Sequence, residues 1–328
     1  MNHFQWRPKE RPCHLINGEF CADSELPFSH FNRGFLYSDG FFETVRICNG
    51  IPQHVALHWN RISASLKAHR IENKQDLTEK KLGQRLQELC ERNAIHQGGR
   101  VRITFFRDGG GRYRPESNEM AWIATAEPLP NNLLTSEEKG LTVDLYSGMQ
   151  KQVNALSNFK NLSSSLYIQA ALWAKDQGLD DALIQNEDFN VIESSHSNLF
   201  LVSNGALYTP SLDSGPVGGV MRASTINVAL RAGYKVYECN ITPHEMMAAD
   251  EIFLTNTLRG IQWIASFKDR RYFHTTSKEL LKLMNEALIS QLEPEGQARD
   301  KFLPLFQALV FQVSFVILLK LCMVIWGK

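Results

Sequence analysis

The chain has 328 residues, with 35 basic and 35 acidic side chains and therefore a formal net charge of zero. This length suffices for one large domain or two ordinary ones, and contents of 43% hydrophobic and 21% charged residues are ordinary for a globular protein. Because the chain has no basic excess and no basic stripe interleaved with aromatic residues, we expect no nucleic-acid binding.

Residues 1–130 are predicted to form an α+β domain. Turns at Asn17-Gly18 and Asn49-Gly50 each join two strand-like runs. Alternating hydrophobicity indicates strands and a 3.6-residue spacing indicates helices. The further predicted elements are helices at residues 56–71 and 77–93 and strands at residues 99–113 and 119–130.

A second α+β domain is predicted for residues 131–290. It follows a linker-like segment at residues 127–140, which is rich in proline and polar residues. Short strand-like runs alternate there with scattered helices, which favours two α+β domains over a doubly wound sheet. The predicted helices cover residues 163–178, 222–234, 242–250 and 277–292.

The two ends of the chain bear on its location. Residues 1–20 contain no apolar core of a secretory signal, so we expect a reducing, cytoplasmic setting. After a polar linker at residues 291–301, residues 302–328 form an apolar tail, of which residues 302–319 carry no charge. That length reaches the lower limit for spanning a membrane. We expect an added apolar helix that associates with a membrane through residues 302–326 or packs on the protein.

Motif searching excludes several chemistries. The chain has no GxGxxG or Walker motif for nucleotides, and no HExxH or GxSxG for zincin or α/β-hydrolase chemistry. Its six cysteines form no CxxC pair and no cluster with histidines, so no metal site is expected.

Three remaining features suggest a different cofactor. Lys160 in "LSNFKNLSSS" has no charged neighbour, Glu193 lies in "VIESSHSNLF", and "SGPVGGVMR" contains a glycine pair before a helix. Singly, these are typical of a surface lysine, a strand-end acid and a turn. Together, a lysine able to be neutral, a phosphate-binding turn and an acid for a pyridine nitrogen are the parts of a pyridoxal-phosphate site.

Six segments in order resemble the class IV aminotransferase family, the fold type IV pyridoxal-phosphate enzymes. They lie between residues 14 and 288. The segments are "NRGFLYSDGFFETVR", "HWNRISASL", "NFKN", "GLDDALIQNEDFNVIESSHSNLFLV", "LYTPSLDSGPVGGVMR" and "DEIFLTNTLRGI".

The resemblance implies a role for each matching residue. Lys160 matches the Schiff-base lysine and general base, Glu193 the acid on the pyridine nitrogen, and Arg61 the arginine on the cofactor phosphate. Further residues expected around that phosphate are Gly219, Val220, Met221, Asn256 and Thr257. Residues expected to face the substrate are Tyr37, Arg102 and Arg107.

The subgroup signatures are most similar to aminodeoxychorismate lyase, which makes 4-aminobenzoate and pyruvate for folate synthesis. Where branched-chain members of the family carry a tyrosine soon after the lysine, this chain has Ser163 to Ser165, which disfavours that activity. The alternatives are a class IV aminotransferase acting on branched-chain or D-amino acids with 2-oxoglutarate, and a non-catalytic, membrane-tethered binding protein on this fold. The resemblance also implies a homodimer with a small-molecule amino substrate.

Overall fold

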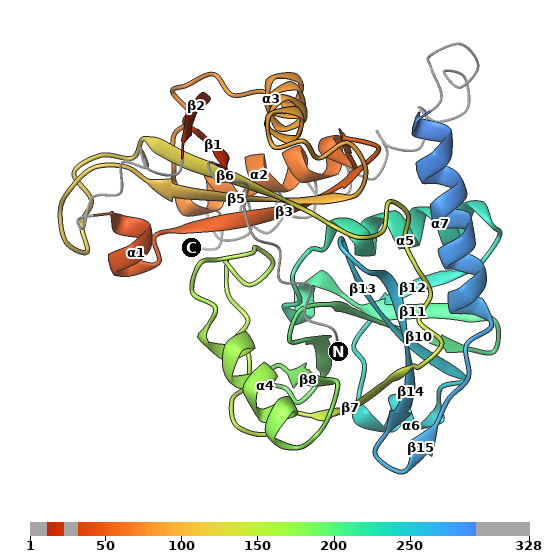
Figure 1. Cartoon of the computed structure of the whole chain (residues 1–328). Helices are drawn as coiled ribbons and strands as arrows, with labels where there is room; N and C mark the ends of the chain where they lie inside the picture. The colour runs from red at the N-terminus through yellow and green to blue at the C-terminus, as the bar shows by residue number, and fades with distance from the viewer. Residues whose placement is uncertain (1–11, 23–31, 293–328) are drawn as a thin grey trace, which may run out of the picture. The chain divides into compact units, whose positions relative to one another are not determined.

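The computed structural model describes residues 12–22 and 32–292, and two β-sheets make up most of it (Figure 1). The first sheet is antiparallel throughout, with the order β2-β1-β6-β5-β3-β4. Its strands are β1 (Cys13–Ile16), β2 (Glu19–Ala22), β3 (Gly40–Cys48), β4 (Ile51–Pro52), β5 (Gly99–Arg107) and β6 (Met120–Pro128).

Strand β5 shows how the sequence divides this sheet into two faces. Its residues alternate between buried and partly exposed positions, as expected for side chains that point to opposite faces in turn. Val101, Ile103 and Phe105 join an apolar core with helices α2 (Val55–His69) and α3 (Glu79–Arg92). Arg100 and Arg102 consequently belong to the other face, and Thr44 of β3 lies directly opposite Arg102.

The second sheet is mixed and follows the order β12-β11-β10-β13-β14-β7-β8-β9. Because β9 also pairs with β10, six of its strands close on themselves like a barrel. The strands are β7 (Leu141–Leu145), β8 (Asp181–Gln185), β9 (Val191–Ser194), β10 (Asn198–Ser203), β11 (Ala206–Pro210), β12 (Val236–Cys239), β13 (Glu251–Asn256), β14 (Gly260–Phe267) and β15 (Arg270–Arg271), the last paired with β14.

The six predicted helices agree with the structure to within three residues, whereas the short helices at residues 33–37 and 212–214 were not predicted. The described helices beyond α2 and α3 are α1 (Arg33–Tyr37), α4 (Ser165–Asp176), the 3₁₀ helix η2 (Leu212–Ser214), α5 (Val220–Arg231), α6 (Pro243–Ala248) and α7 (Thr276–Leu292). Helix α5 begins two residues before the predicted start because Gly219 caps it with extended backbone.

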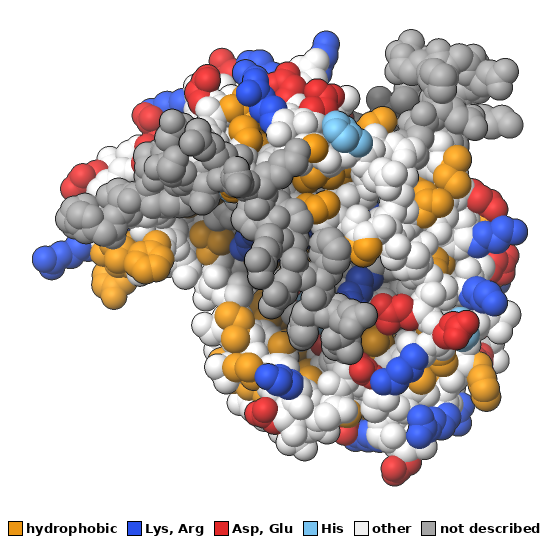
Figure 2. All heavy atoms as spheres, viewed as in Figure 1, with side chains coloured by type: hydrophobic (Ala, Val, Ile, Leu, Met, Phe, Trp, Pro, Cys, Tyr) orange, Lys and Arg blue, Asp and Glu red, His pale blue; other side chains and the backbone are white. Residues whose placement is uncertain are grey.

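The α+β class is confirmed, with one sheet formed from residues before position 129 and the other from residues after position 140. The domain boundaries at residues 130 and 290 stay a prediction. The apolar tail at residues 302–328 lies outside the described residues. Among the helices within residues 12–22 and 32–292, none is long and apolar enough to cross a membrane. On the face drawn in Figure 2, acidic and basic side chains are interspersed, in keeping with the zero net charge.

Candidate active site

A cavity of about 380 Å³ collects almost all of the predicted site residues. Strands β3 and β5 of the first sheet line it, together with β9, β10, β13 and the start of α5 from the second half of the chain. Every residue predicted to bind the cofactor lies in its wall, and so does Arg102: the set is Arg61, Arg102, Lys160, Glu193, Gly219, Val220, Met221, Asn256 and Thr257.

Lys160 is held in the cavity by backbone pairing between its loop and β3. The Phe42 amide donates to the Lys160 carbonyl at 2.8 Å, and the Leu162 amide donates to the Gly40 carbonyl at 3.0 Å. The Lys160 Nζ lies 4.6 Å from the centre of the Phe42 ring. Burial, followed by the positive charge of Arg61, lowers the pKa of Lys160 to about 8. The amine is therefore able to be neutral near physiological pH.

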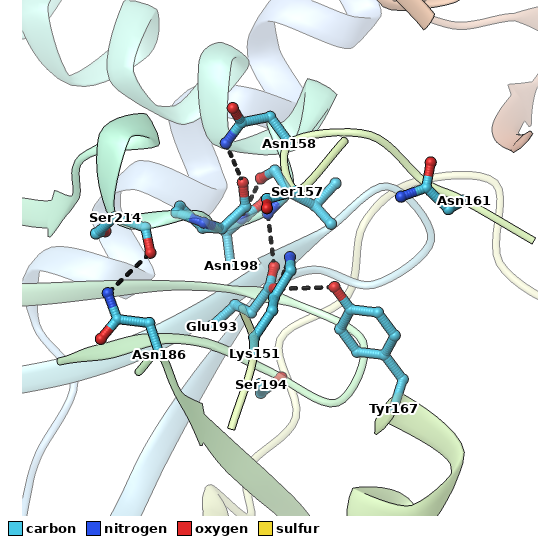
Figure 3. A network of polar contacts seen from close by, with 12 residues as sticks. Lys151, Ser157, Asn158, Asn161, Tyr167, Asn186, Glu193, Ser194, Asn198 and Ser214 are labelled. Carbon is cyan, nitrogen blue, oxygen red and sulfur yellow. Dashed lines mark hydrogen bonds and ion pairs between the residues drawn. The ribbon is translucent and has the colours of Figure 1, made fainter. Parts of the chain in front are cut away.

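Glu193 is 3% exposed and receives three donors (Figure 3). Its Oε1 accepts from Lys151 Nζ at 2.6 Å and from the Tyr167 hydroxyl at 2.9 Å, while its Oε2 accepts from the Val217 amide at 2.8 Å. Burial and the negative charge of Glu193 raise the pKa of Tyr167, so that this hydroxyl remains a donor. Glu193 is thus a carboxylate of fixed orientation in the wall of the cavity.

Arg61 is oriented by a carboxylate that the sequence analysis did not identify. Its Nε and Nη2 donate to the two oxygens of Glu43 at 2.8 and 2.6 Å, and its Nη1 donates to the Gly218 carbonyl at 2.9 Å. Burial raises the pKa of Glu43, but the charge and hydrogen bonds of Arg61 and the hydrogen bond with His58 outweigh it and bring the pKa to about 2. This bidentate geometry fixes the plane of the guanidinium.

The start of α5 forms an anion-binding cradle. No side chain caps its first amide groups, which leaves the N–H groups of Val220 and Met221 at a helix N-terminus. A Cβ on Gly219 would lie 1.9 Å from Asn198 Oδ1, so a larger residue would require the Asn198 side chain or the start of α5 to shift. Thr255 also lines the cavity: it is 1% exposed, and its Oγ1 is buried without a hydrogen-bond partner among the described residues.

Asn256 and Thr257 complete this end of the cavity. The Asn256 side chain donates to Ser197 Oγ at 2.9 Å and accepts from the amides of Leu258 and Arg259 at 3.1 and 2.9 Å. It therefore shapes the turn after β13, while Thr257 lines the cavity beside it. A free amide cradle, an arginine and a buried hydroxyl without a partner together suit a phosphate group.

Arg102 differs from the other arginines of the cavity because it has no carboxylate partner in the described part of the chain. Its Cζ lies 3.9 Å from the centre of the Phe42 ring, the same ring that Lys160 approaches. Burial and the neighbouring Arg100 lower the pKa of Arg102. Arg100 itself pairs with Glu127 at 2.5 Å. A partly buried guanidinium without a counter-ion is suited to hold an anionic group of a ligand.

The structure does not bring Tyr37 and Arg107 to the cavity. Arg107 is 7% exposed and donates to Asp39 at 3.0 Å and to the His69 carbonyl at 2.7 Å, so it joins segments of the first half of the chain. Tyr37, on α1, packs against Tyr113 with ring centres 5.8 Å apart.

Tyr167 changes the argument drawn from Ser163 to Ser165. The sequence analysis treated these serines as the loss of a tyrosine after Lys160, but a tyrosine two residues into α4 lines the cavity and contacts Glu193. The serines therefore give no ground for excluding an activity. Glu43, Lys151 and Tyr167 were missed because their partners are distant in sequence; the only local signal was an acid within the buried run of β3.

Comparisons with known proteins identify the family of the chain. A family model described as amino-transferase class IV matches residues 40–267. A putative branched-chain-amino-acid aminotransferase of Methanocaldococcus jannaschii is 26% identical over 280 residues, which cover 83% of this chain and 93% of that protein. The aminodeoxychorismate lyase of Bacillus subtilis is 27% identical over 258 residues, which cover 75% and 83%.

Solved structures show the same fold. A branched-chain aminotransferase of Thermoproteus uzoniensis superimposes with a TM-score of 0.79 at 21% identity, covering 86% of this chain and 96% of that one. A putative 4-amino-4-deoxychorismate lyase of Legionella pneumophila gives a TM-score of 0.69 at 25% identity, covering 80% and 97%. With more than half of its length matched by the family model, the chain belongs to the class IV aminotransferase family.

Proposed function

We propose that the protein is a pyridoxal-phosphate-dependent aminodeoxychorismate lyase, which converts 4-amino-4-deoxychorismate to 4-aminobenzoate and pyruvate. Class IV enzymes use pyridoxal 5'-phosphate, and the residues of the cavity suit it. Relatives named aminodeoxychorismate lyase from Bacillus subtilis and Vibrio harveyi are 27% and 26% identical. The observation that carries the proposal is Arg102, a cation without a counter-ion beside Lys160.

Each part of the cofactor has a place among the described residues. Arg61 and the amide groups at the start of α5 would hold the phosphate, Glu193 would pair with the ring nitrogen, and Lys160 would carry the covalent link. When bound, the cofactor supplies a ring that accepts the electron pair left at the carbon bearing the substrate amine. Lys151, Tyr167 and the Val217 amide keep the Glu193 carboxylate pointing in one direction.

Lys160 is the general base of the proposed reaction. Its low pKa of about 8 lets the amine, once free, accept the proton from the carbon that bears the substrate amine. The Phe42 ring beside it keeps water from the amine and so maintains that pKa.

Arg102 selects for a carboxylate on the substrate. Its guanidinium is partly buried and lies over the same ring as Lys160, so an anionic group held there would lie near the reacting carbon. 4-Amino-4-deoxychorismate offers two carboxylates to this arginine, whereas a branched-chain amino acid offers only its α-carboxylate and leaves the arginine unpaired if that group is bound elsewhere. An unpaired buried charge costs binding free energy.

A class IV aminotransferase is the alternative. Relatives named D-alanine aminotransferase, such as that of Listeria monocytogenes at 25% identity over 252 residues, favour it alongside the archaeal branched-chain relative. Arg102 could then bind the second carboxylate of 2-oxoglutarate. The chain is an enzyme of this family, which sets aside the non-catalytic binding protein considered from the sequence. A homodimeric state, a cytoplasmic location and a role in folate synthesis belong to the proposal.

One assay with two substrates separates the activities. Purified protein is incubated with 4-amino-4-deoxychorismate while 4-aminobenzoate and pyruvate are measured, and in parallel with branched-chain or D-amino acids and 2-oxoglutarate. We expect release of 4-aminobenzoate and at most slow amino transfer. Turnover of the amino acids without any 4-aminobenzoate would replace the lyase by the aminotransferase.

Replacement of Arg102 tests the substrate anchor. In Arg102→Gln, we expect KM for 4-amino-4-deoxychorismate to rise by about 10- to 100-fold, because a charge-assisted hydrogen bond contributes roughly 1.5–3 kcal/mol. Cofactor binding should change less, because the proposal assigns the phosphate to Arg61 and the amide groups at the start of α5 and not to Arg102. Arg100→Gln is the matched control, because Arg100 already pairs with Glu127. Equal effects of the two substitutions would contradict a specific role for Arg102.

A further inference from the structure

A histidine held by a buried aspartate borders the cavity. The turn between β9 and β10 contains Ser195 and His196, both of which line the cavity. Ser195 Oγ donates to Asp181 Oδ1 at 2.6 Å, and His196 Nδ1 lies 2.9 Å from Ser195 Oγ and 3.4 Å from Asp181 Oδ2. Asp181 is 2% exposed, and its Oδ2 has no hydrogen-bond partner among the described residues. One side of the imidazole is therefore fixed by Ser195 and Asp181.

The geometry differs from that of a hydrolytic triad. In a triad, the serine and the aspartate contact opposite nitrogens of the histidine, so that the far nitrogen can take the serine proton. Here Ser195 and Asp181 both approach Nδ1, and the serine hydroxyl donates to the aspartate. The arrangement therefore does not activate Ser195 as a nucleophile. Instead it directs the N–H of Nδ1 to Ser195 Oγ, with the Asp181 carboxylate 3.4 Å from the same nitrogen.

The other nitrogen of His196 is free to act on a ligand. The side chain is 48% exposed, and Nε2 has no hydrogen-bond partner in the part of the chain that the structure describes. Because His196 lines the same cavity as Lys160 and Arg102, a substrate bound there would be within reach of this ring. Glu193 is the other acid or base of β9 and this turn that lines the cavity. Both of its oxygens already accept hydrogen bonds, from Lys151 and from the Val217 amide.

We propose that His196 is the general acid that protonates the departing enolpyruvate, with Asp181 as its positioning residue. This step rests on the proposed lyase function. Lys160 takes the proton from the carbon bearing the amine, and the carbon–oxygen bond to the enolpyruvyl group breaks as the six-membered ring becomes aromatic. The step uses the imidazolium form of His196, in which the Nδ1 proton faces Ser195 and the Nε2 proton passes to the leaving group, which ends as pyruvate. One proton is lost from the substrate and one is gained by the leaving group, so the step balances without an oxidant or reductant.

The proposal predicts that His196 acts after Lys160, and a labelled substrate separates the two steps. 4-Amino-4-deoxychorismate carrying deuterium at the amine-bearing carbon is incubated with holoenzyme. Loss of deuterium from recovered substrate reports proton removal by Lys160, and pyruvate formation reports departure of the leaving group. The variants are His196→Gln, Asp181→Asn and, as a matched control, His244→Gln on the exposed surface of α6.

We expect pyruvate formation by His196→Gln to fall by about 100-fold or more, because general acids contribute roughly 10²- to 10⁴-fold. Deuterium loss, visible cofactor absorbance and Tm should stay at wild-type levels. Asp181→Asn should show a smaller loss of pyruvate formation with the same retention of deuterium loss, and His244→Gln should show none.

Two results would overturn the proposal while leaving the lyase intact: unchanged pyruvate formation by His196→Gln, or an equal fall of pyruvate formation and deuterium loss. A wild-type enzyme that makes no 4-aminobenzoate would overturn the proposed function and this step together.

Discussion

At the scale of the residue, Lys160 owes its chemistry to groups that are remote in sequence. Its ten-residue segment contains no acid, yet Arg61, Glu43 and Glu193 all act on its amine in the folded chain. Desolvation is the largest influence and favours the neutral form. A lysine of this kind is suited to take a proton, whereas a solvated lysine would be cationic at the same pH.

The pH dependence of proton removal follows from this pKa. Because the cation is the protonated form, lowering the pH below about 8 converts the neutral base to the inactive cation, and the rate should fall about tenfold per pH unit. The measurement is the rate of deuterium loss from the amine-bearing carbon as a function of pH. Phe42→Ala should admit water and move the inflection upward, toward the ordinary lysine value, while Phe189→Ala on the exposed surface should not. An inflection that stays in place in Phe42→Ala would contradict the desolvation argument.

The buried pair of Glu43 and Arg61 gives a second prediction. Glu43→Gln removes the negative charge that faces the buried Arg61 and leaves one amide oxygen and the Gly218 carbonyl as its acceptors. Breaking such a pair costs roughly 3–5 kcal/mol, so the free energy of unfolding should fall by about that amount and the cofactor should bind more weakly. Glu127→Gln, which breaks the partly exposed pair with Arg100, should cost no more than about 1 kcal/mol. Chemical denaturation of both variants checks this, and similar losses would contradict it.

The same pair makes stability depend on acidity. The pKa of Glu43 is depressed to about 2 from an ordinary value of 4.5, so its contribution is complete above pH 4.5 and is lost as the pH falls toward 2. Denaturation of the wild type between these pH values should therefore show a loss of stability that is smaller in Glu43→Gln. Equal pH slopes for the two proteins would exclude Glu43 as the source.

At the scale of the element, the site depends on how strand ends and helix starts meet. Strand β9 places Glu193 in the wall, β10 places Asn198 beside Gly219, and α5 directs its free amide groups into the cavity. Because Asn198 Oδ1 occupies the space where a Cβ on Gly219 would lie, the Asn198 side chain packs directly against the backbone at the start of α5. This close approach is what the glycine pair in "GPVGGVMR" provides.

Gly219→Ala tests the cradle at this scale. The added methyl would meet Asn198 Oδ1 at 1.9 Å, so the start of α5 or the Asn198 side chain must shift. We expect at least tenfold weaker binding of pyridoxal 5'-phosphate, with a smaller effect on pyridoxal, which lacks the phosphate. Gly83→Ala within α3 is the matched control, because its methyl would meet Val55 at an ordinary 3.5 Å. Titration of the visible absorbance measures both, and an unchanged preference for the phosphorylated form would contradict the cradle.

At the scale of the whole molecule, the sequence predicted what is local and missed what is long-range. Strand alternation and helix spacing follow from burial of one face, so the α+β class and the helices were predictable. The resemblance to the family identified Lys160, Glu193 and Arg61, which the structure brings to one cavity. Arg107 was also expected to face the substrate, but it donates instead to Asp39 and to the His69 carbonyl. These partners lie far from Arg107 in sequence and meet it only in the folded chain.

Pairings across long stretches of chain could not be predicted from local patterns. Glu193 meets Lys151 across 42 positions, and Arg61 reaches the Gly218 carbonyl across 157. His196 and Asp181 likewise meet through the turn between β9 and β10 and the start of β8. These contacts fix the orientation of Glu193 and Arg61, which the sequence had indicated, and of His196, which it had not.

Lys160 is proposed to hold the cofactor in this cavity, and the covalent link can be located directly. Holoenzyme is reduced with borohydride and digested, and the peptide bearing the pyridoxyl group is identified by mass spectrometry. We predict modification of Lys160 alone and none in Lys160→Ala, although Lys151 lies close to the same Glu193 carboxylate. A pyridoxyl group on Lys151, or its persistence in Lys160→Ala, would contradict the account.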